Sequence, residues 1–144
     1  MTYTDLDALT KEVSQEILEK LAPDGSGGID PDVVDEANKK AVDEVHGFLR
    51  GVYTLPLDAP VDGLIELTVN EITQYQLYKS VDAADVPEQI GELYKGALKR
   101  LKAIREREIS IEAEEDLGGD ENNPATFKVI SPAAKFPAGF TKRF

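Results

Sequence analysis

The chain has 144 residues, of which 41% are hydrophobic and 31% charged, and its formal charge at pH 7 is −12. This size and composition fit one domain with one modest core. The chain has no cysteine, which excludes disulfides, thiolate metal sites and thiol nucleophiles, and its negative charge argues against general binding to nucleic acids.

Two short helices are predicted at the start of the chain. Thr4 and Asp7 form a capping-box pattern that begins the first helix, and Ser14 can cap the second. Pro23 and three nearby glycines then break the helical pattern. We expect these two helices to lie as a lid over the long helix that follows.

The glycine-rich turn between them and the long helix resembles part of a calcium loop. In that register the first and last ligand positions fall on Ala22 and Val33, so the leading carboxylate and the closing acid are both missing. A register that starts at Asp24 ends on Asp35 but puts Ile29 where glycine is needed. We therefore predict no metal site here, and interpret the turn as the approach to a capped helix.

The first long helix is predicted over residues 30–51. Asp30 is a suitable N-cap, and Pro31 stands at the first helical position, where a missing N–H costs nothing. Apolar residues recur at steps of three and four and form one stripe: Val34, Ala37, Ala41, Val45 and Phe48. We expect Phe48 to lie at the centre of the core. Gly51 ends the helix, and the proline five residues later requires an extended chain.

His46, the single histidine, follows Val45 at the edge of this stripe. Because no serine or cysteine nucleophile stands in a recognisable frame, we interpret it as a partly buried packing residue. The acidic residues are too many to single out a pair for acid–base work, and no glycine-rich phosphate loop is present. We therefore expect no enzyme, no catalytic residue and no cofactor.

Two further long helices are predicted. The first runs from about Val61 to Lys79, and its expected apolar face consists of Leu64, Leu67, Thr68, Ile72, Tyr75 and Tyr78. The second, over residues 86–107, has a capped start at Asp85 and the strongest stripe in the sequence: Ile90, Leu93, Tyr94, Ala97, Leu98, Leu101 and Ile104. We predict an all-α fold, a small bundle of four to five helices in which residues 30–51 and 86–107 pack together.

The apolar period changes from helical to alternating beyond Arg107. Ile109–Ala113 and Thr126–Ile130 alternate, so the tail is predicted to be extended and able to form a short β-hairpin. We therefore predict a helical domain over residues 1–108 and an extended tail over residues 109–144.

Charge also separates this tail into two parts. Residues 109–122 hold six acids and no base, whereas residues 123–144 hold four bases and no acid. The tail is therefore acidic and then basic. Its four phenylalanines have no helical stripe to join and are expected to contact the bundle of their own subunit or of the next: Phe127, Phe136, Phe140 and Phe144. We interpret the tail as an assembly arm.

A second group of candidate assembly contacts lies in the last helix. Lys99, Arg100 and Arg105 are among the cations that crowd its C-terminal half. One interpretation is that these cations complement the negative end of the helix and pair with neighbouring acids. The other is that they form a contact patch for a neighbouring acidic subunit.

The exit from the first long helix carries the most specific pattern in the chain. It combines a turn with an apolar, proline-broken segment: Gly47, Phe48, Leu49, Gly51, Tyr53, Leu55, Pro56 and Leu57. Together with Tyr3 near the start and Tyr94 in the last helix, this pattern resembles the Mu-like prophage family of small helical neck proteins. The resemblance covers residues 3–111.

The resemblance implies a structural role in a tailed phage. Members of the family look like head–tail connector (adaptor, or head completion) proteins, which form a ring beneath the portal. It implies that the partners are other copies of the chain, the portal protein and a tail-proximal neck protein, with DNA only as cargo through the channel. It also implies a location in the host cytoplasm during assembly and then in the virion.

The sequence gives no sign of a membrane segment. No run approaches the apolar length of a membrane span, and the N-terminus lacks the basic start and the apolar block of a signal peptide. We therefore expect a soluble, intracellular protein. A small monomeric binding or regulatory module of unknown ligand remains the alternative function.

Overall fold

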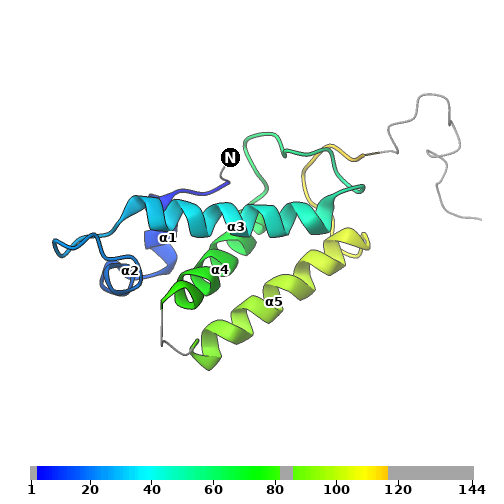
Figure 1. Cartoon of the computed structure of the whole chain (residues 1–144). Coiled ribbons are helices and arrows are strands. Elements are labelled where there is room, and N and C mark those ends of the chain that lie inside the picture. Colours follow the sequence, from blue (N-terminus) through cyan, green and yellow to red (C-terminus); the bar gives the residue numbers. More distant parts are fainter. Residues whose placement is uncertain (1–2, 82–85, 117–144) are drawn as a thin grey trace, which may run out of the picture.

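A computed structural model describes residues 3–81 and 86–116 of the chain (Figure 1). The described residues form five helices and no β-strand, which confirms the predicted all-α class. The helices are α1 (Leu6–Glu12), α2 (Gln15–Leu21), α3 (Pro31–Leu49), α4 (Gly63–Ser80) and α5 (Glu88–Arg105). The three long helices pack together, and α1 and α2 lie near the end where α3 begins (Figure 1).

Helix α3 begins as predicted, because the Asp30 side chain accepts a hydrogen bond from the Asp32 N–H at 2.9 Å and Pro31 occupies the first turn. The prediction that Phe48 lies at the centre of the core is wrong. Leu49 is fully buried, whereas Phe48 is only partly buried against the edge of the core. The guanidinium of Arg105 lies 5.3 Å from the centre of the Phe48 ring. The stripe continues from Val45 by four residues and not by three, which moves the aromatic ring to the flank.

Helix α4, and not α3, is the centre of the bundle. It packs against both α3 and α5, and α1 and α2 also contact it. Its buried residues therefore point in several directions: Ile65, Thr68, Val69, Asn70, Glu71, Ile72, Thr73, Gln74 and Leu77. The predicted apolar face is wrong in part, since Leu64, Leu67, Tyr75 and Tyr78 are only partly buried. A helix that is enclosed by neighbours has no single core face to predict.

Helix α5 packs mainly on α4 and also contacts α3, so the predicted packing of residues 30–51 on residues 86–107 is present but less extensive than the packing of either helix on α4. It buries three residues of its predicted stripe: Ala97, Leu101 and Ile104. Leu93, also in that stripe, is 37% exposed. Asp85, the predicted cap, lies outside the described residues; α5 starts at Glu88, and Pro87 stands at the N-cap position without a side-chain cap bond.

Two hydrophobic clusters divide the interior. The larger one lies between α3, α4 and α5 and includes Tyr53 and Leu57 from the connection after α3. The smaller one joins α1 and α2 to the first half of α3 and to Leu77 near the end of α4. The two short helices therefore cover both α3 and α4.

The chain reverses direction at the end of α5. Arg107 adopts a left-handed conformation with φ 65°. The N–H of Glu108 donates to the carbonyl of Ala103 at 2.8 Å, and the N–H of Arg107 donates to the carbonyl of Ile104 at 3.0 Å. These are the two bonds of a Schellman motif, in which the left-handed position usually belongs to glycine.

The described part of the tail returns to the bundle. Ile111 is buried in the larger cluster, and Ile109 and Ala113 pack against it, so the start of the predicted tail contacts the bundle of its own subunit. Ile109–Ala113 forms no strand; instead the Thr54 N–H donates to the Glu114 carbonyl at 2.8 Å, and the Asp116 N–H donates to the Val52 carbonyl at 2.9 Å. The segment Thr126–Ile130 lies outside the described residues.

Candidate functional site

The predicted motif from Gly47 to Leu57 forms the corner between α3 and α4. Gly51 has a φ of 86° and turns the chain, and the Tyr53 N–H bonds back to the carbonyl of Leu49 at 3.0 Å. Leu49, Tyr53 and Leu57 are buried, whereas Phe48 and Leu55 pack on the core from its edge; Gly47 and Pro56 are exposed. The motif is thus mainly a structural corner.

Tyr3 fastens this corner to the start of the chain. Its hydroxyl accepts a hydrogen bond from the Leu57 N–H at 2.9 Å and also bonds Nε2 of His46. The Tyr3 and His46 rings meet edge to face with their centres 5.4 Å apart. Burial raises the pKa of Tyr3 and lowers the pKa of His46, so both groups favour their neutral forms.

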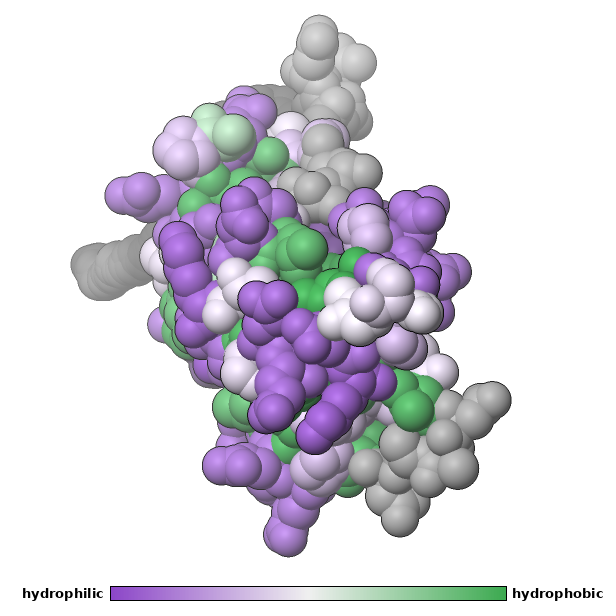
Figure 2. All heavy atoms as spheres, turned by 90° about the vertical axis from the view of Figure 1, so that its left-hand side faces the viewer, coloured by the Kyte–Doolittle hydropathy of each residue, from purple (hydrophilic) through white to green (hydrophobic). Residues whose placement is uncertain are grey.

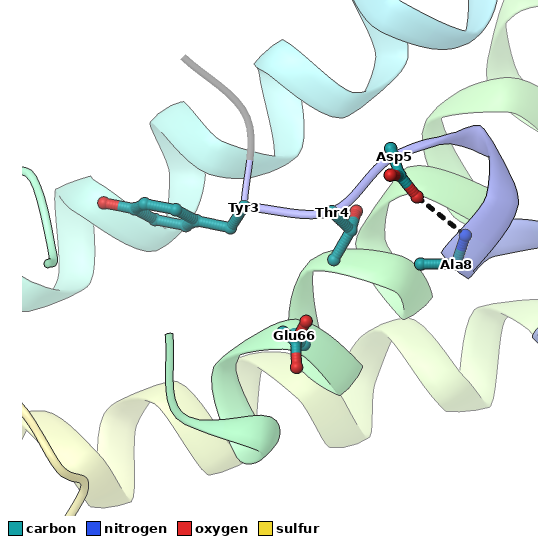
Figure 3. A pocket seen from close by; sticks show the side chains of 5 residues that line it. All are labelled: Tyr3, Thr4, Asp5, Ala8 and Glu66. Carbon is teal, nitrogen blue, oxygen red and sulfur yellow. Dashed lines mark hydrogen bonds between the residues drawn. The ribbon is translucent and has the colours of Figure 1, made fainter. Parts of the chain in front are cut away.

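Two hollows flank Tyr3 and share Glu66 as a wall. One, of about 350 Å³, is lined by Tyr3, Thr4, Asp5, Ala8 and Glu66 (Figure 3). The other, of about 490 Å³, continues past Tyr3 along residues 56–61. Asp5 is already engaged as the N-cap of α1, because it accepts the Ala8 N–H at 2.8 Å. We name these two hollows the Tyr3 groove; its lining can bind by shape and hydrogen bonding, and it includes the Tyr3 hydroxyl that bonds His46.

Polar side chains inside the bundle join the long helices. The Tyr94 hydroxyl of α5 donates to Oε2 of Glu44 on α3 at 2.6 Å. The Tyr94 ring also stacks on Tyr75 of α4, with ring centres 3.9 Å apart. Burial, together with the Glu44 carboxylate, raises the pKa of Tyr94. One side chain therefore contacts all three long helices.

Arg100, a predicted assembly contact, turns inward instead. Its Nη1 donates to Oε1 of Glu71 at 2.8 Å and to Oγ1 of Thr68 at 3.0 Å, and only 22% of its side chain is exposed. Lys99 is exposed on α5, and Arg105 is exposed beside Phe48. Phe127, Phe136, Phe140 and Phe144 lie outside the described residues.

Acidic and histidine side chains form no triple cluster that could hold a metal ion within residues 3–81 and 86–116. In the glycine-rich turn, Oδ1 of Asp24 accepts hydrogen bonds from the Ser26 N–H, the Ser26 hydroxyl and the Gly28 N–H. The backbone bond from Ser26, followed by that from Gly28, lowers the pKa of Asp24. In the same part of the chain no helix is long and apolar enough to cross a membrane.

Comparison with protein families decides the affiliation of the chain. A family model described as "Bacteriophage Mu, Gp36" matches residues 3–129. The chain belongs to this family. The match confirms the resemblance to a Mu-like phage protein and extends it past Ile111 to residue 129. Comparison with curated proteins finds no match.

The Gp36 match begins at Tyr3, the residue that holds the α3–α4 corner. Sequence reasoning noted Tyr3 in the family pattern but assigned it no role, because its partners lie 43 and 54 residues further along the chain. It also missed Tyr94, Glu44 and Glu71 as links between helices. The signal that could have identified these links is a buried tyrosine, because its hydroxyl needs a hydrogen-bond partner.

Proposed function

We propose that this member of the Gp36 family is a structural protein of a tailed phage or prophage, a head–tail connector subunit that forms a ring beneath the portal. The observation that carries the proposal is that polar side chains hold the elements of the bundle together. Tyr94, Arg100 and Tyr3 each join separate elements of the fold. A ring subunit requires this rigidity and needs no nucleophile or cofactor.

The charge of the chain supports the same proposal. A net charge of −12 repels the phosphate backbone at long range. Acidic subunits around a channel let DNA pass as cargo without adhering to the wall. In this proposal the chain is not an enzyme, and its partners are other copies of itself, the portal protein above and a tail-proximal neck protein below. It acts in the host cytoplasm during assembly and then in the virion.

Two experiments test this function. The purified full-length chain is expected to change from monomers to closed rings as its concentration rises, measured by light scattering and by negative-stain electron microscopy. Phage particles produced without the chain are expected to have filled heads that lack tails. A protein that stays monomeric at all concentrations, in particles that assemble normally without it, would defeat the proposal.

The Tyr3 groove favours a second candidate function, a small monomeric binding module. Two adjoining hollows of about 350 and 490 Å³ have the size of sites that hold small ligands or an extended peptide. A monomeric chain that retains a specific ligand at this groove would support that alternative.

A further inference from the structure

Opposite charges gather on two different parts of the molecule. Residues 3–36, which comprise α1, α2 and the start of α3, hold ten acidic and two basic residues, a net charge of −8. Helix α5 holds five basic and two acidic residues, a net charge of +3, and all of its bases except the inward-turned Arg100 are exposed. We name the first region the acidic end and the exposed side of α5 the basic face. Figure 1 shows α2 and α5 well apart, so the two regions do not neutralise each other within one subunit.

Each region also carries one exposed apolar side chain. Among the described residues, Ile17 on α2 and Leu93 on α5 are the large hydrophobic residues that remain exposed, at 36% and 37%. Figure 2 views the molecule from the side of α2 and shows small apolar areas among mainly hydrophilic residues. An apolar anchor inside a polar rim is the usual composition of a protein–protein contact.

The basic face is open to a partner. Leu93, Gly96 and Lys99 follow one another at steps of three along α5, so they lie side by side on its surface. Nothing lies within 4 Å of the position that a Cβ would take at Gly96. Within the described residues, Lys99 and Lys102 are exposed and have no ion-pair partner. Their charges are therefore available to another molecule.

We propose that the basic face of one subunit docks on the acidic end of the next copy of this chain, with Leu93 and Ile17 as the apolar anchors of the contact. The contact joins two different surfaces, so it is head-to-tail, and repetition of it closes a ring when the rotation between subunits allows. Charge complementarity selects this occupant over DNA, because the net charge of the whole chain opposes approach to phosphate. The proposal rests on the proposed ring and names its subunit contact.

The test is a reciprocal charge reversal in the full-length chain. One variant carries Lys99→Glu and Lys102→Glu on the basic face, and the other carries Glu12→Lys and Glu16→Lys on the acidic end; all four positions are exposed. Each variant alone is expected to raise the concentration for half-assembly by about tenfold or more, because the basic-face variant changes the net charge of α5 from +3 to −1 and the acidic-end variant halves the net charge of residues 3–36 from −8 to −4. An equimolar mixture of the two variants is expected to assemble within about threefold of the wild type, since one of its two alternating interfaces carries no substitution and the other has opposite charges at the four substituted positions.

The matched control is Lys39→Glu with Lys40→Glu. These lysines are exposed on α3 outside both regions, and the change in net charge equals that of the basic-face variant. The control is expected to assemble like the wild type. Leu93→Ser adds a test of the anchor, with weaker assembly expected and only a small change in melting temperature.

Four outcomes overturn the proposal. Wild-type rings together with normal rings from the basic-face variant would show that another surface makes the contact, while the ring function stands. A mixture that fails to recover would show that the two regions do not face each other. A basic-face variant that forms rings normally but loses affinity for duplex DNA would assign the face to nucleic acid. A wild-type chain that never associates removes both this contact and the proposed function.

Discussion

Helices α4 and α5 have the same length, 18 residues, but opposite relations to the core. α5 has the clearer division into apolar and polar sides in its sequence, yet it buries only Ala97, Leu101 and Ile104. α4 has no such division, yet it buries nine of its residues. A strong amphipathic pattern therefore marks a helix at the edge of a bundle, whereas a helix with neighbours on several sides has no single apolar side.

The largest effect on stability is expected from a substitution in the interior of α4. Ile72→Ala is expected to lower the free energy of unfolding by about 2–5 kcal/mol, because Ile72 is fully buried and its removal leaves a cavity. Leu93→Ala on α5 is the matched control and should change it by only about 0.5–1 kcal/mol. Urea denaturation followed by circular dichroism measures both. Equal losses at the two positions would abolish the contrast between the helices.

The second largest effect on stability is expected at the ion pair between Arg100 of α5 and Glu71 of α4. Arg100→Met leaves the Glu71 carboxylate, whose side chain is only 11% exposed, without its partner. The expected loss is about 2–3 kcal/mol in the free energy of unfolding. Adding Glu71→Gln to Arg100→Met should recover part of this loss, because no unpaired charge then remains. A double-mutant cycle by urea denaturation measures the coupling, and additive losses would contradict it.

Phe48 tests the boundary of the core between α3 and α5. Because the ring is only partly buried, Phe48→Ala is expected to cost about 1–2 kcal/mol and not the ~3–5 kcal/mol of a central phenylalanine. Its neighbour Leu49 is fully buried, and Leu49→Ala should cost more than Phe48→Ala. Thermal unfolding of the two variants decides which residue occupies the centre.

Tyr94 sets how strongly α5 is held to α3. Tyr94→Phe removes the hydrogen bond to Glu44 and should cost about 1 kcal/mol at neutral pH. The pKa of Tyr94 is raised above its ordinary value of 10.0. Its contribution to stability is therefore complete below about pH 10 and falls as the pH rises above that value, because only the unfolded chain ionises there.

The measurement that checks this is the free energy of unfolding of the wild type and of Tyr94→Phe between pH 7 and 11. The wild type should lose more stability above about pH 10 than Tyr94→Phe does. Some alkaline loss should persist in the variant, because Tyr3 also has a raised pKa. Parallel pH profiles would show that Tyr94 is not protected in the folded state.

The smallest effect concerns the left-handed residue at the end of α5. Arg107→Gly and Arg107→Ala both remove the ion pair with Glu115, so the difference between them isolates the backbone at φ 65°. Arg107→Gly is expected to be more stable than Arg107→Ala by about 0.5–1 kcal/mol, because glycine has no Cβ to clash in that conformation. Calorimetric melting temperatures check the order, which a more stable alanine variant would reverse.

Local patterns predicted the helices and most of their beginnings. Asp30 caps α3 and Ser14 caps α2 as expected, because these signals depend only on residues within one turn. The cap of α1 was predicted one residue early: Asp5 is the cap. The hydroxyl of Thr4 instead accepts a hydrogen bond from Asn38 at 2.8 Å, a contact that no local pattern contains.

The central place of α4 could not be read from the sequence for the same reason. Its buried polar residues, such as Thr73 and Glu71, weaken the apolar pattern, and their partners come from other helices. The return of residues 109–116 to Val52–Thr54 depends on a pairing across some sixty residues, which periodicity cannot detect. The Tyr3 groove depends on such distant contacts as well.

The anchoring of Tyr3 also sets an order on synthesis. The tyrosine leaves the ribosome first, but the Leu57 N–H that it binds is made 54 residues later. At roughly 5–20 residues per second, about 3–11 s separate the two events. During that interval the Tyr3 hydroxyl lacks the Leu57 N–H that it binds in the folded chain. We therefore expect nascent chains arrested before Leu57 emerges to leave Tyr3 open to proteases and chaperones, and longer ones to protect it.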